Sequence, residues 1–211
     1  MGDDERRDSA DIGRLLTLTD GVFAIALTLL VLDLDVPDNL ASGDGAVWGA
    51  VLDQGANLLA LAISFVVIAA FWSGHRFKFR GVDRLDGPIL WLNFAFLASI
   101  TLMPFTTKLI ADYGNDEAGV AVYAANVAIA AAVMTLMYVF VARQKHEPLS
   151  LVMVIDSGTF DTAVVFALSI PVALAGASTA AKWMWVILAV SGRLLAKIPG
   201  VSERSRGTAG R

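Results

Sequence analysis

The chain has 211 residues, of which 56% are hydrophobic, and its mean hydropathy is +0.65. This composition is far more apolar than that of a soluble domain of the same size, so it indicates an integral membrane protein. Cysteine is absent, which excludes disulfides, thiolate metal sites and a cysteine nucleophile. The formal net charge of −4 says little by itself, because the basic residues are distributed unevenly along the chain.

The N-terminal part of the chain changes from polar to apolar within a few residues. Residues 1–11 are polar and mixed in charge, without the apolar run of a signal peptide, and we expect them to form a short cytoplasmic tail. Residues 13–37 follow, and their apolar run exceeds the roughly 20 residues that a helix needs to cross a bilayer. The sequence therefore predicts the first membrane helix in this stretch.

This first helix carries a narrow apolar stripe. At helical periodicity, one face collects Leu18, Gly21, Ile25, Thr28, Leu29 and Leu32. The stripe holds a single hydroxyl group, so its composition suits a hydrophobic constriction in a pore. Lipid contact and helix packing are more common roles of such a face, and periodicity alone leaves these interpretations open.

Acidic residues lie near both ends of the first helix. Asp20 lies inside the apolar stretch and away from the stripe, where an unpaired charge costs on the order of 3 kcal/mol. We therefore expect Asp20 to pair with Arg14 or to accept hydrogen bonds from neighbouring helices. At the other end, Asp33 and Asp35 either form an external acidic mouth that concentrates cations or belong to an ordinary solvated loop.

Five further helices are predicted, at residues 51–73, 89–110, 119–141, 159–177 and 180–195. Pro104 is expected to kink the third helix because it removes a backbone hydrogen bond, and Thr106 and Thr107 are expected to compensate nearby carbonyls. The predicted fold class is an all-α membrane protein with six transmembrane helices over residues 12–198. Residues 199–211 are predicted to form a disordered cytoplasmic C-terminal tail.

The basic residues gather on one side of the membrane in this arrangement. All 16 Lys and Arg residues except Lys108 and Lys182 fall on the side of the termini. Cytoplasmic loops carry the excess of Lys and Arg in membrane proteins, so both termini are predicted to be cytoplasmic. The even number of predicted helices agrees with this orientation.

The run from Arg14 to Ile25, RLLTLTDGVFAI, resembles the RxxxFSDGVFAI signature of the transmembrane protein 175 family of potassium channels. Leu18 stands where the family has Phe, and Thr19 stands where it has Ser, which keeps the hydroxyl. The resemblance continues through residues 28–37 (TLLVLDLDVP), Phe71-Trp72-x-x-His75, Trp91-Leu92-Asn93 and Met103-Pro104-Phe105-Thr106. It covers approximately the first half of the chain.

The resemblance implies a homotetramer in which the first helix of each subunit lines a central pore. Several chains are needed, because the sequence contains no internal repeat. The implied constriction consists of Ile25, Leu29 and Leu32, with Ile25 at the tightest point, and Thr28 is the implied ligand that selects potassium over sodium. A structural polar network is implied at the inner end of the pore helix, made of Arg14, Thr19, Asp20, His75, Trp91 and Asn93. Solvation of His75 at the membrane interface is the alternative.

The implied partners are further copies of the chain, the lipid bilayer, K⁺ and other monovalent cations. No cofactor, resident metal or nucleic acid is expected, and the implied location is the bacterial cell membrane. The sequence contains no TVGYG filter, so selectivity for potassium would have to come from side chains.

Enzymatic motifs such as HExxH, GxSxG and a Walker loop are absent from the sequence, which argues against an enzyme. Two other functions stay open beside a channel. One is a small proton-coupled transporter with Asp20 as the proton-carrying group, and the other is a non-conducting membrane assembly protein. Ion flux measured with and without a proton gradient separates the three.

Overall fold

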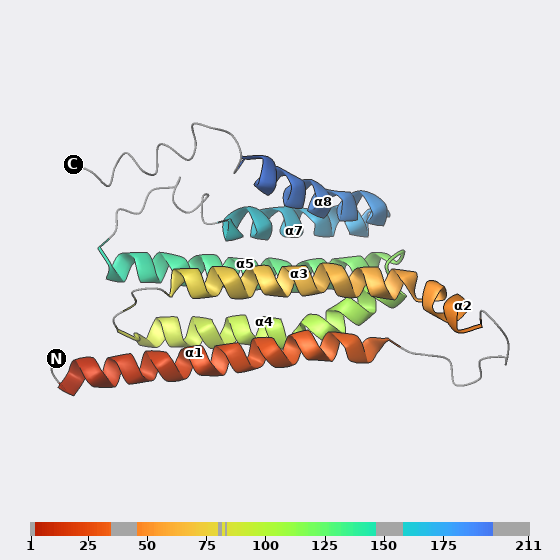
Figure 1. Ribbon diagram of the computed structural model, residues 1–211. Coiled ribbons are helices and arrows are strands. Elements are labelled where there is room, and N and C mark those ends of the chain that lie inside the picture. Colours follow the sequence, from red (N-terminus) through yellow and green to blue (C-terminus); the bar gives the residue numbers. More distant parts are fainter. Residues whose placement is uncertain (1–2, 35–45, 80–81, 83, 147–157, 196–211) are drawn as a thin grey trace.

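The computed structural model describes residues 3–34, 46–79, 82, 84–146 and 158–195. Within these residues the chain forms α-helices and one 3₁₀-helix, most of which run side by side along one direction (Figure 1). The elements in order are α1 (Asp3–Leu29), η1 (Leu30–Asp33), α2 (Ala46–Asp53), α3 (Gly55–Lys78), α4 (Gly87–Asp112), α5 (Glu117–Gln144), α7 (Thr159–Leu174) and α8 (Ser178–Leu195).

Four stretches of the described chain are long and apolar enough to cross a membrane: Asp8–Leu32, Asn57–Lys78, Gly87–Asp112 and Glu117–Gln144. They correspond to the first four helices predicted from the sequence. Helices α7 and α8 form close to the fifth and sixth predicted positions, and α7 is apolar but only 16 residues long. An all-helical, multi-pass membrane architecture is thus present, with four rather than six helices of clear spanning length.

Several helix boundaries differ from the sequence-based prediction. Helix α1 begins at Asp3, so most of the predicted polar tail is helical, because residues 3–11 contain no Gly or Pro to interrupt the helix. At its other end, α1 gives way to η1 at Leu30, earlier than the predicted end at Pro37. The predicted second helix is divided in two at Gln54, and its longer part, α3, continues to Lys78.

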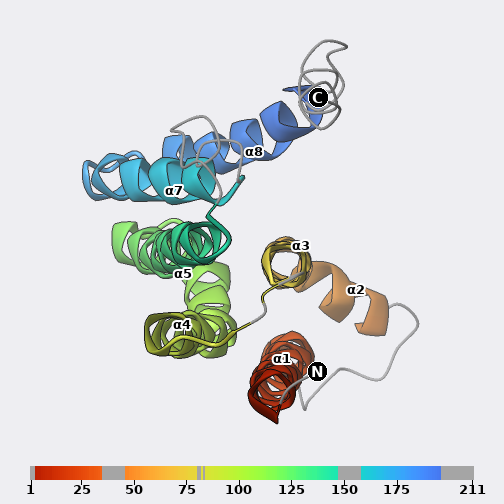
Figure 2. The ribbon, with the colours of Figure 1, turned by 90° about the vertical axis from the view of Figure 1, so that its left-hand side faces the viewer.

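Helix α4 contacts three other helices of the bundle. It packs against α1, α3 and α5, while α5 in turn packs against α7, and α7 against α8. Viewed along the helices, α4, α5, α7 and α8 form a row, with α1 and α3 beside α4 and α5 (Figure 2). The small buried side chains Ala124, Ala130 and Ala131 allow the close approach of other helices to α5.

Pro104 lies within α4, which changes direction along its length (Figure 1). The hydroxyls of Thr106 and Thr107 both donate to the carbonyl of Met103, at 3.2 and 2.7 Å, as the sequence led us to expect. On the neighbouring helix, Asn126 Nδ2 donates to the carbonyl of Ser99 at 3.1 Å. Side chains therefore donate hydrogen bonds to backbone carbonyls near the position where proline lacks a backbone donor.

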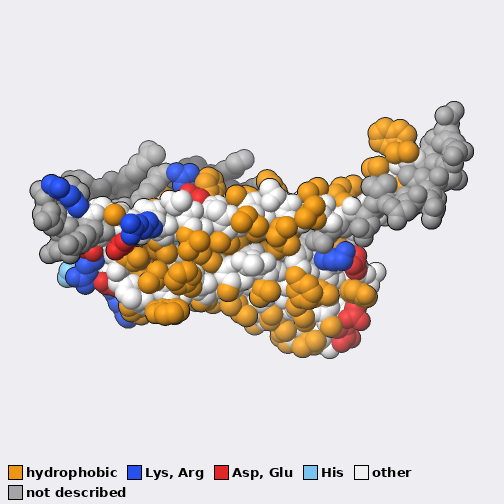
Figure 3. All heavy atoms as spheres, turned by 90° about the horizontal axis from the view of Figure 1, so that it is seen from below, with side chains coloured by type: hydrophobic (Ala, Val, Ile, Leu, Met, Phe, Trp, Pro, Cys, Tyr) orange, Lys and Arg blue, Asp and Glu red, His pale blue; other side chains and the backbone are white. Residues whose placement is uncertain are grey.

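Charged side chains gather at the two ends of the molecule, and orange apolar atoms cover much of the surface between them (Figure 3). The end at which α3 and α5 finish carries Arg76 and Arg143, and we call it the basic end. The N-terminal part of α1 lies at the same end (Figure 1). The opposite end carries Asp116 and Glu117 at the start of α5.

Candidate ion pathway

Helix α1 has one face buried against the other helices of the chain and one face left uncovered. The buried face carries Leu15, Phe23, Ala26 and Leu30, all less than 5% exposed, and helix α4 packs against α1. The predicted stripe lies on the other face, where the exposed fractions are 45% for Leu18, 60% for Ile25, 38% for Leu29 and 70% for Leu32. Large apolar side chains along one face need either lipid or other protein surfaces beside them.

A shallow groove runs along this uncovered face toward the basic end. Its lining residues are Ala10, Gly13, Arg14, Thr17, Leu18, Gly21, Val22 and Ile25. The small residues Gly13 and Gly21 leave it open, since no side chain projects from either position. The stripe and this groove are therefore one continuous surface of α1.

Thr28 is the only polar side chain among the six residues of the stripe. Its hydroxyl donates to the carbonyl of Ile25 at 2.9 Å, three residues earlier in the helix, rather than to the carbonyl of Ala24. A hydroxyl has one proton and two lone pairs, so this bond leaves the lone pairs of Oγ1 able to accept or to coordinate a cation.

A buried polar network joins three of the predicted residues across three helices. Asn93 on α4 donates from Nδ2 to the hydroxyl of Thr19 on α1 at 3.2 Å, and its Oδ1 lies 2.8 Å from Nε2 of His75 on α3. All three side chains are buried. Their hydrogen bonds fix the relative positions of α1, α3 and α4 near the basic end.

His75 is enclosed instead of being solvated at the membrane interface. Its ring stacks on Phe79, with centroids 4.3 Å apart, and lies parallel to Phe96 at 5.7 Å. Nδ1 is buried and has no hydrogen-bond partner within the described residues. The bond to Asn93 is therefore the one that orients this imidazole.

Asp20 is held by Trp72, a residue that the sequence analysis did not assign to the network. The indole Nε1 donates to Asp20 Oδ1 at 2.8 Å, joining α1 to α3. The guanidinium of Arg76 lies over the same indole ring, 4.9 Å from its centroid. The sequence signal was present in Phe71-Trp72-x-x-His75, since residues 72 and 75 share a helix face, but aromatic residues at a membrane boundary are usually anchors.

The other predicted site residues lie apart from this network. Arg14 pairs with Asp11 at 3.4 Å on the exposed surface, and Trp91 is 73% exposed, with its ring 6.0 Å from that of Phe94. Within the described chain, neither reaches Thr19, Asp20, His75 or Asn93. Asp33 ends η1, and Asp35 lies outside the described residues.

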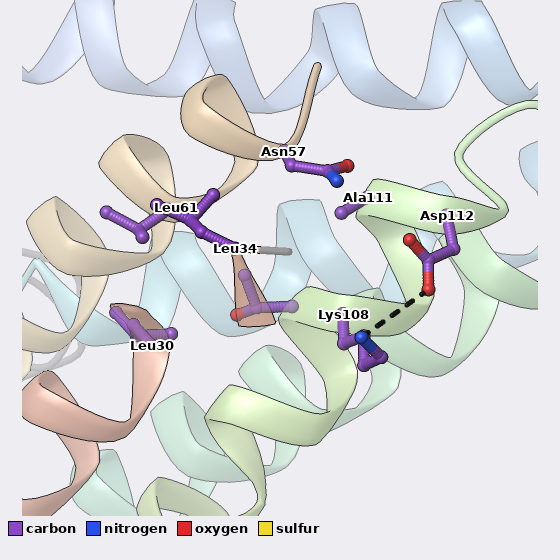
Figure 4. A pocket seen from close by; sticks show the side chains of 8 residues that line it. Leu30, Leu34, Asn57, Leu61, Lys108, Ala111 and Asp112 are labelled. Atoms are coloured by element: carbon purple, nitrogen blue, oxygen red, sulfur yellow. Dashed lines mark ion pairs between the residues drawn. The ribbon is translucent and has the colours of Figure 1, made fainter. Parts of the chain in front are cut away.

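A separate small cavity lies toward the opposite end of the bundle, between η1, α3 and α4 (Figure 4). Its volume of about 10 Å³ is close to the minimum for one water molecule. Lys108 and Asp112 form an ion pair at 4.0 Å beside it. The cavity is too small to be part of an ion pathway through the chain.

We expect Trp72→Phe to lower the stability of the folded protein by about 1 kcal/mol, because it removes the indole donor from Asp20 and keeps the aromatic bulk. Asp20→Asn retains an acceptor oxygen and should have a smaller effect. Neither change should alter the preference among ions if Asp20 is structural. Thermal unfolding and ion-replacement recordings measure the two effects. Trp183→Phe, at a 61% exposed position of α8, is the matched control.

Several bilayer-length apolar helices packed around buried polar side chains define a multi-pass integral membrane protein. A model of the family described as "Endosomal/lysosomal potassium channel TMEM175" matches residues 14–104. The chain belongs to the TMEM175 family, and the resemblance found in its sequence is confirmed. The members are ion channels and not enzymes.

The similar proteins include two bacterial potassium channels. The chain is 36% identical over 126 residues to one of Streptomyces collinus, covering 60% of each chain. It is 31% identical over 135 residues to one of a Chryseobacterium species, covering 64% of this chain and 67% of that one. The chain thus spans about three fifths to two thirds of the length of these relatives.

A solved structure shares the fold over most of the chain. The crystal structure of a homologue from Chamaesiphon minutus, described as a lysosomal potassium-selective channel TMEM175 homolog, superposes with a TM-score of 0.65 at 28% identity. The match covers 85% of this chain and 98% of that chain. The architecture described above is therefore that of TMEM175 channels.

Proposed function

We propose that the protein is a potassium-permeable cation channel that prefers K⁺ over Na⁺ and assembles as a homotetramer around α1. The observation that carries the proposal is the uncovered stripe of α1, which faces away from the rest of its own subunit. Relatives named potassium channels support the same function. The protein would lie in the bacterial cell membrane with six spans and both termini in the cytoplasm, in agreement with its basic end.

In this tetramer, four copies of Ile25, Leu29 and Leu32 form stacked apolar rings around the axis. Narrow apolar rings gate by losing water, so small changes of helix tilt switch conduction. Between them, four Thr28 hydroxyls present oxygen lone pairs to a partly dehydrated cation. The acidic residues Asp33 and Asp35 would form the external mouth and concentrate cations there.

The proposal is tested with the purified protein reconstituted in liposomes, with potassium, sodium and proton movements measured separately. A channel passes potassium down its gradient without a proton gradient. Dependence on a proton gradient would instead favour a transporter with Asp20 as the coupled group, and absence of flux would favour an assembly protein. Mass measurement in nanodiscs tests the stoichiometry, and a functional monomer contradicts the shared pore.

Thr28→Ala is expected to reduce the K⁺ over Na⁺ permeability ratio more than the total current, because it deletes four ligands without narrowing the pore. Bi-ionic reversal potentials measure this ratio. Thr101→Ala is the matched control, since Thr101 on α4 makes the same kind of hydroxyl bond to its own helix, to Leu97 at 2.9 Å. Equal permeability ratios in both variants would exclude Thr28 from ion selection.

A further inference from the structure

We propose that Asp11 and Arg14 form a charge-compensated inner mouth of the pore, in which Asp11 neutralises the Arg14 of its own chain and keeps the mouth open to cations. This inference rests on the proposed channel function and adds Asp11 and Arg14 to the residues proposed to line the pore. The pair is not part of the buried network of Thr19, His75 and Asn93.

Asp11 and Arg14 lie on the same face of α1 as the stripe. Arg14 lines the same groove as Leu18 and Ile25, and the helix is continuous between them. At 100° per residue, Arg14 and Asp11 both lie within about 40° of Ile25 around the helix axis. A rise of 1.5 Å per residue places Arg14 about 16 Å from Ile25 along that axis, toward the basic end. If Ile25 faces the pore, Arg14 and Asp11 face its inner entrance.

Both side chains of the pair are exposed. Arg14 Nη1 lies 3.4 Å from Asp11 Oδ1, and the side chains are 83% and 57% exposed. An ion pair this exposed contributes little to folding stability. Asp8 and Asp20 lie well off this face of the helix, by about 100° and about 140° from Ile25. Asp11 therefore lies on this face of α1 and pairs with Arg14, whereas Asp8 and Asp20 do not lie on it.

Symmetry makes this small local pairing important for conduction. Four Arg14 side chains around one axis would make a ring of positive charge, which repels cations that approach from the basic end. Asp11 places four negative charges beside that ring, so that the mouth has no net charge from these residues. Because both side chains are exposed to water, their effect must weaken as salt shortens the screening length.

Asp11→Asn tests the inference in excised membrane patches. We expect the K⁺ current entering from the basic end to fall about tenfold at about 0.01 M salt and less than about twofold at about 1 M, giving salt-dependent rectification. The double variant Asp11→Asn with Arg14→Gln should restore a symmetric current, because it removes the uncompensated charge. Asp8→Asn removes an acidic residue from the same helix end off the groove, and it should not rectify.

The cysteine-free sequence provides a second measurement that does not depend on Asp11. In Arg14→Cys, a cationic thiol reagent applied from the basic end should restore the positive ring and reduce current. Labelling that leaves the current unchanged, or Asp11→Asn channels that conduct without rectification at low salt, would overturn the inference. If the proposed channel function were wrong, the unmodified protein itself would carry no potassium current. That result is distinct from the outcomes that would overturn the inference about Asp11 and Arg14.

Discussion

Ile25→Asn is expected to raise potassium flux about tenfold, which corresponds to removing roughly 1.4 kcal/mol from the barrier at the constriction. Ile25 is 60% exposed on the face of α1 that the other helices of the chain leave uncovered. In the proposed tetramer this side chain forms an apolar ring, and water leaves a narrow apolar ring readily. An amide at each of the four positions holds water in the neck and thereby lowers the cost of ion passage.

Single-channel conductance and open probability, recorded before and after the substitution, measure this effect. Ile63→Asn is the matched control. Ile63 is 46% exposed on α3, so this substitution makes the same chemical change on a helix other than α1. If both variants conduct like the unmodified protein, α1 does not line the pore. If both raise flux equally, the effect belongs to general loosening of the helices and not to a hydrated constriction.

Asn93→Ala is expected to destabilise the protein by about 2 kcal/mol, because it removes the amide that joins Thr19 and His75. The hydroxyl of Thr19 and Nε2 of His75 would each lose their bond to Asn93 in a place that water does not reach. Buried polar groups without partners cost about 1–3 kcal/mol each, and interhelical hydrogen bonds in membranes fall at the lower end of this range.

A lower midpoint of thermal unfolding in detergent and a smaller assembled fraction would both show this loss. Asn57→Ala provides the comparison, because the amide of Asn57 bonds to Gln54 within one helical turn, at 2.6 Å, and joins no separate helices. Equal destabilisation by the two substitutions would mean that the three-helix connection has no special role. Unchanged ion preference in surviving Asn93→Ala channels is expected, since Asn93 does not lie on the stripe.

The network and the stripe occupy opposite faces of one helix, which explains why α1 tolerates a polar residue such as Thr19 at membrane depth. Thr19 faces α4 and accepts a hydrogen bond from Asn93, while Ile25 and Leu29 face outward. Asp20 also points away from the stripe, about 100° from Thr19 around the helix axis, and accepts a hydrogen bond from Trp72 on α3. The hydrogen bonds of these polar residues therefore help to set the rotation of α1, and that rotation determines which residues would face the axis of the proposed tetramer.

The sequence by itself determined the membrane class, the positions of the main helices and the composition of the stripe on α1. These properties follow from local rules, because bilayer thickness sets the length of an apolar run and helical periodicity sets which residues share a face. The motif from Arg14 to Ile25 also identified the family, which the match over residues 14–104 confirmed.

Only the tertiary structure decided which polar residues meet. Thr19 and Asn93 are 74 positions apart, and Trp72 and Asp20 are 52 apart, so their contacts depend on the rotation and crossing of separate helices. Those quantities are set by side-chain packing, which periodicity within one helix does not encode. For the same reason the sequence left His75 between burial and solvation and grouped Arg14 with the network, whereas packing buries His75 beside Phe96 and leaves Arg14 paired with Asp11 on the outer face.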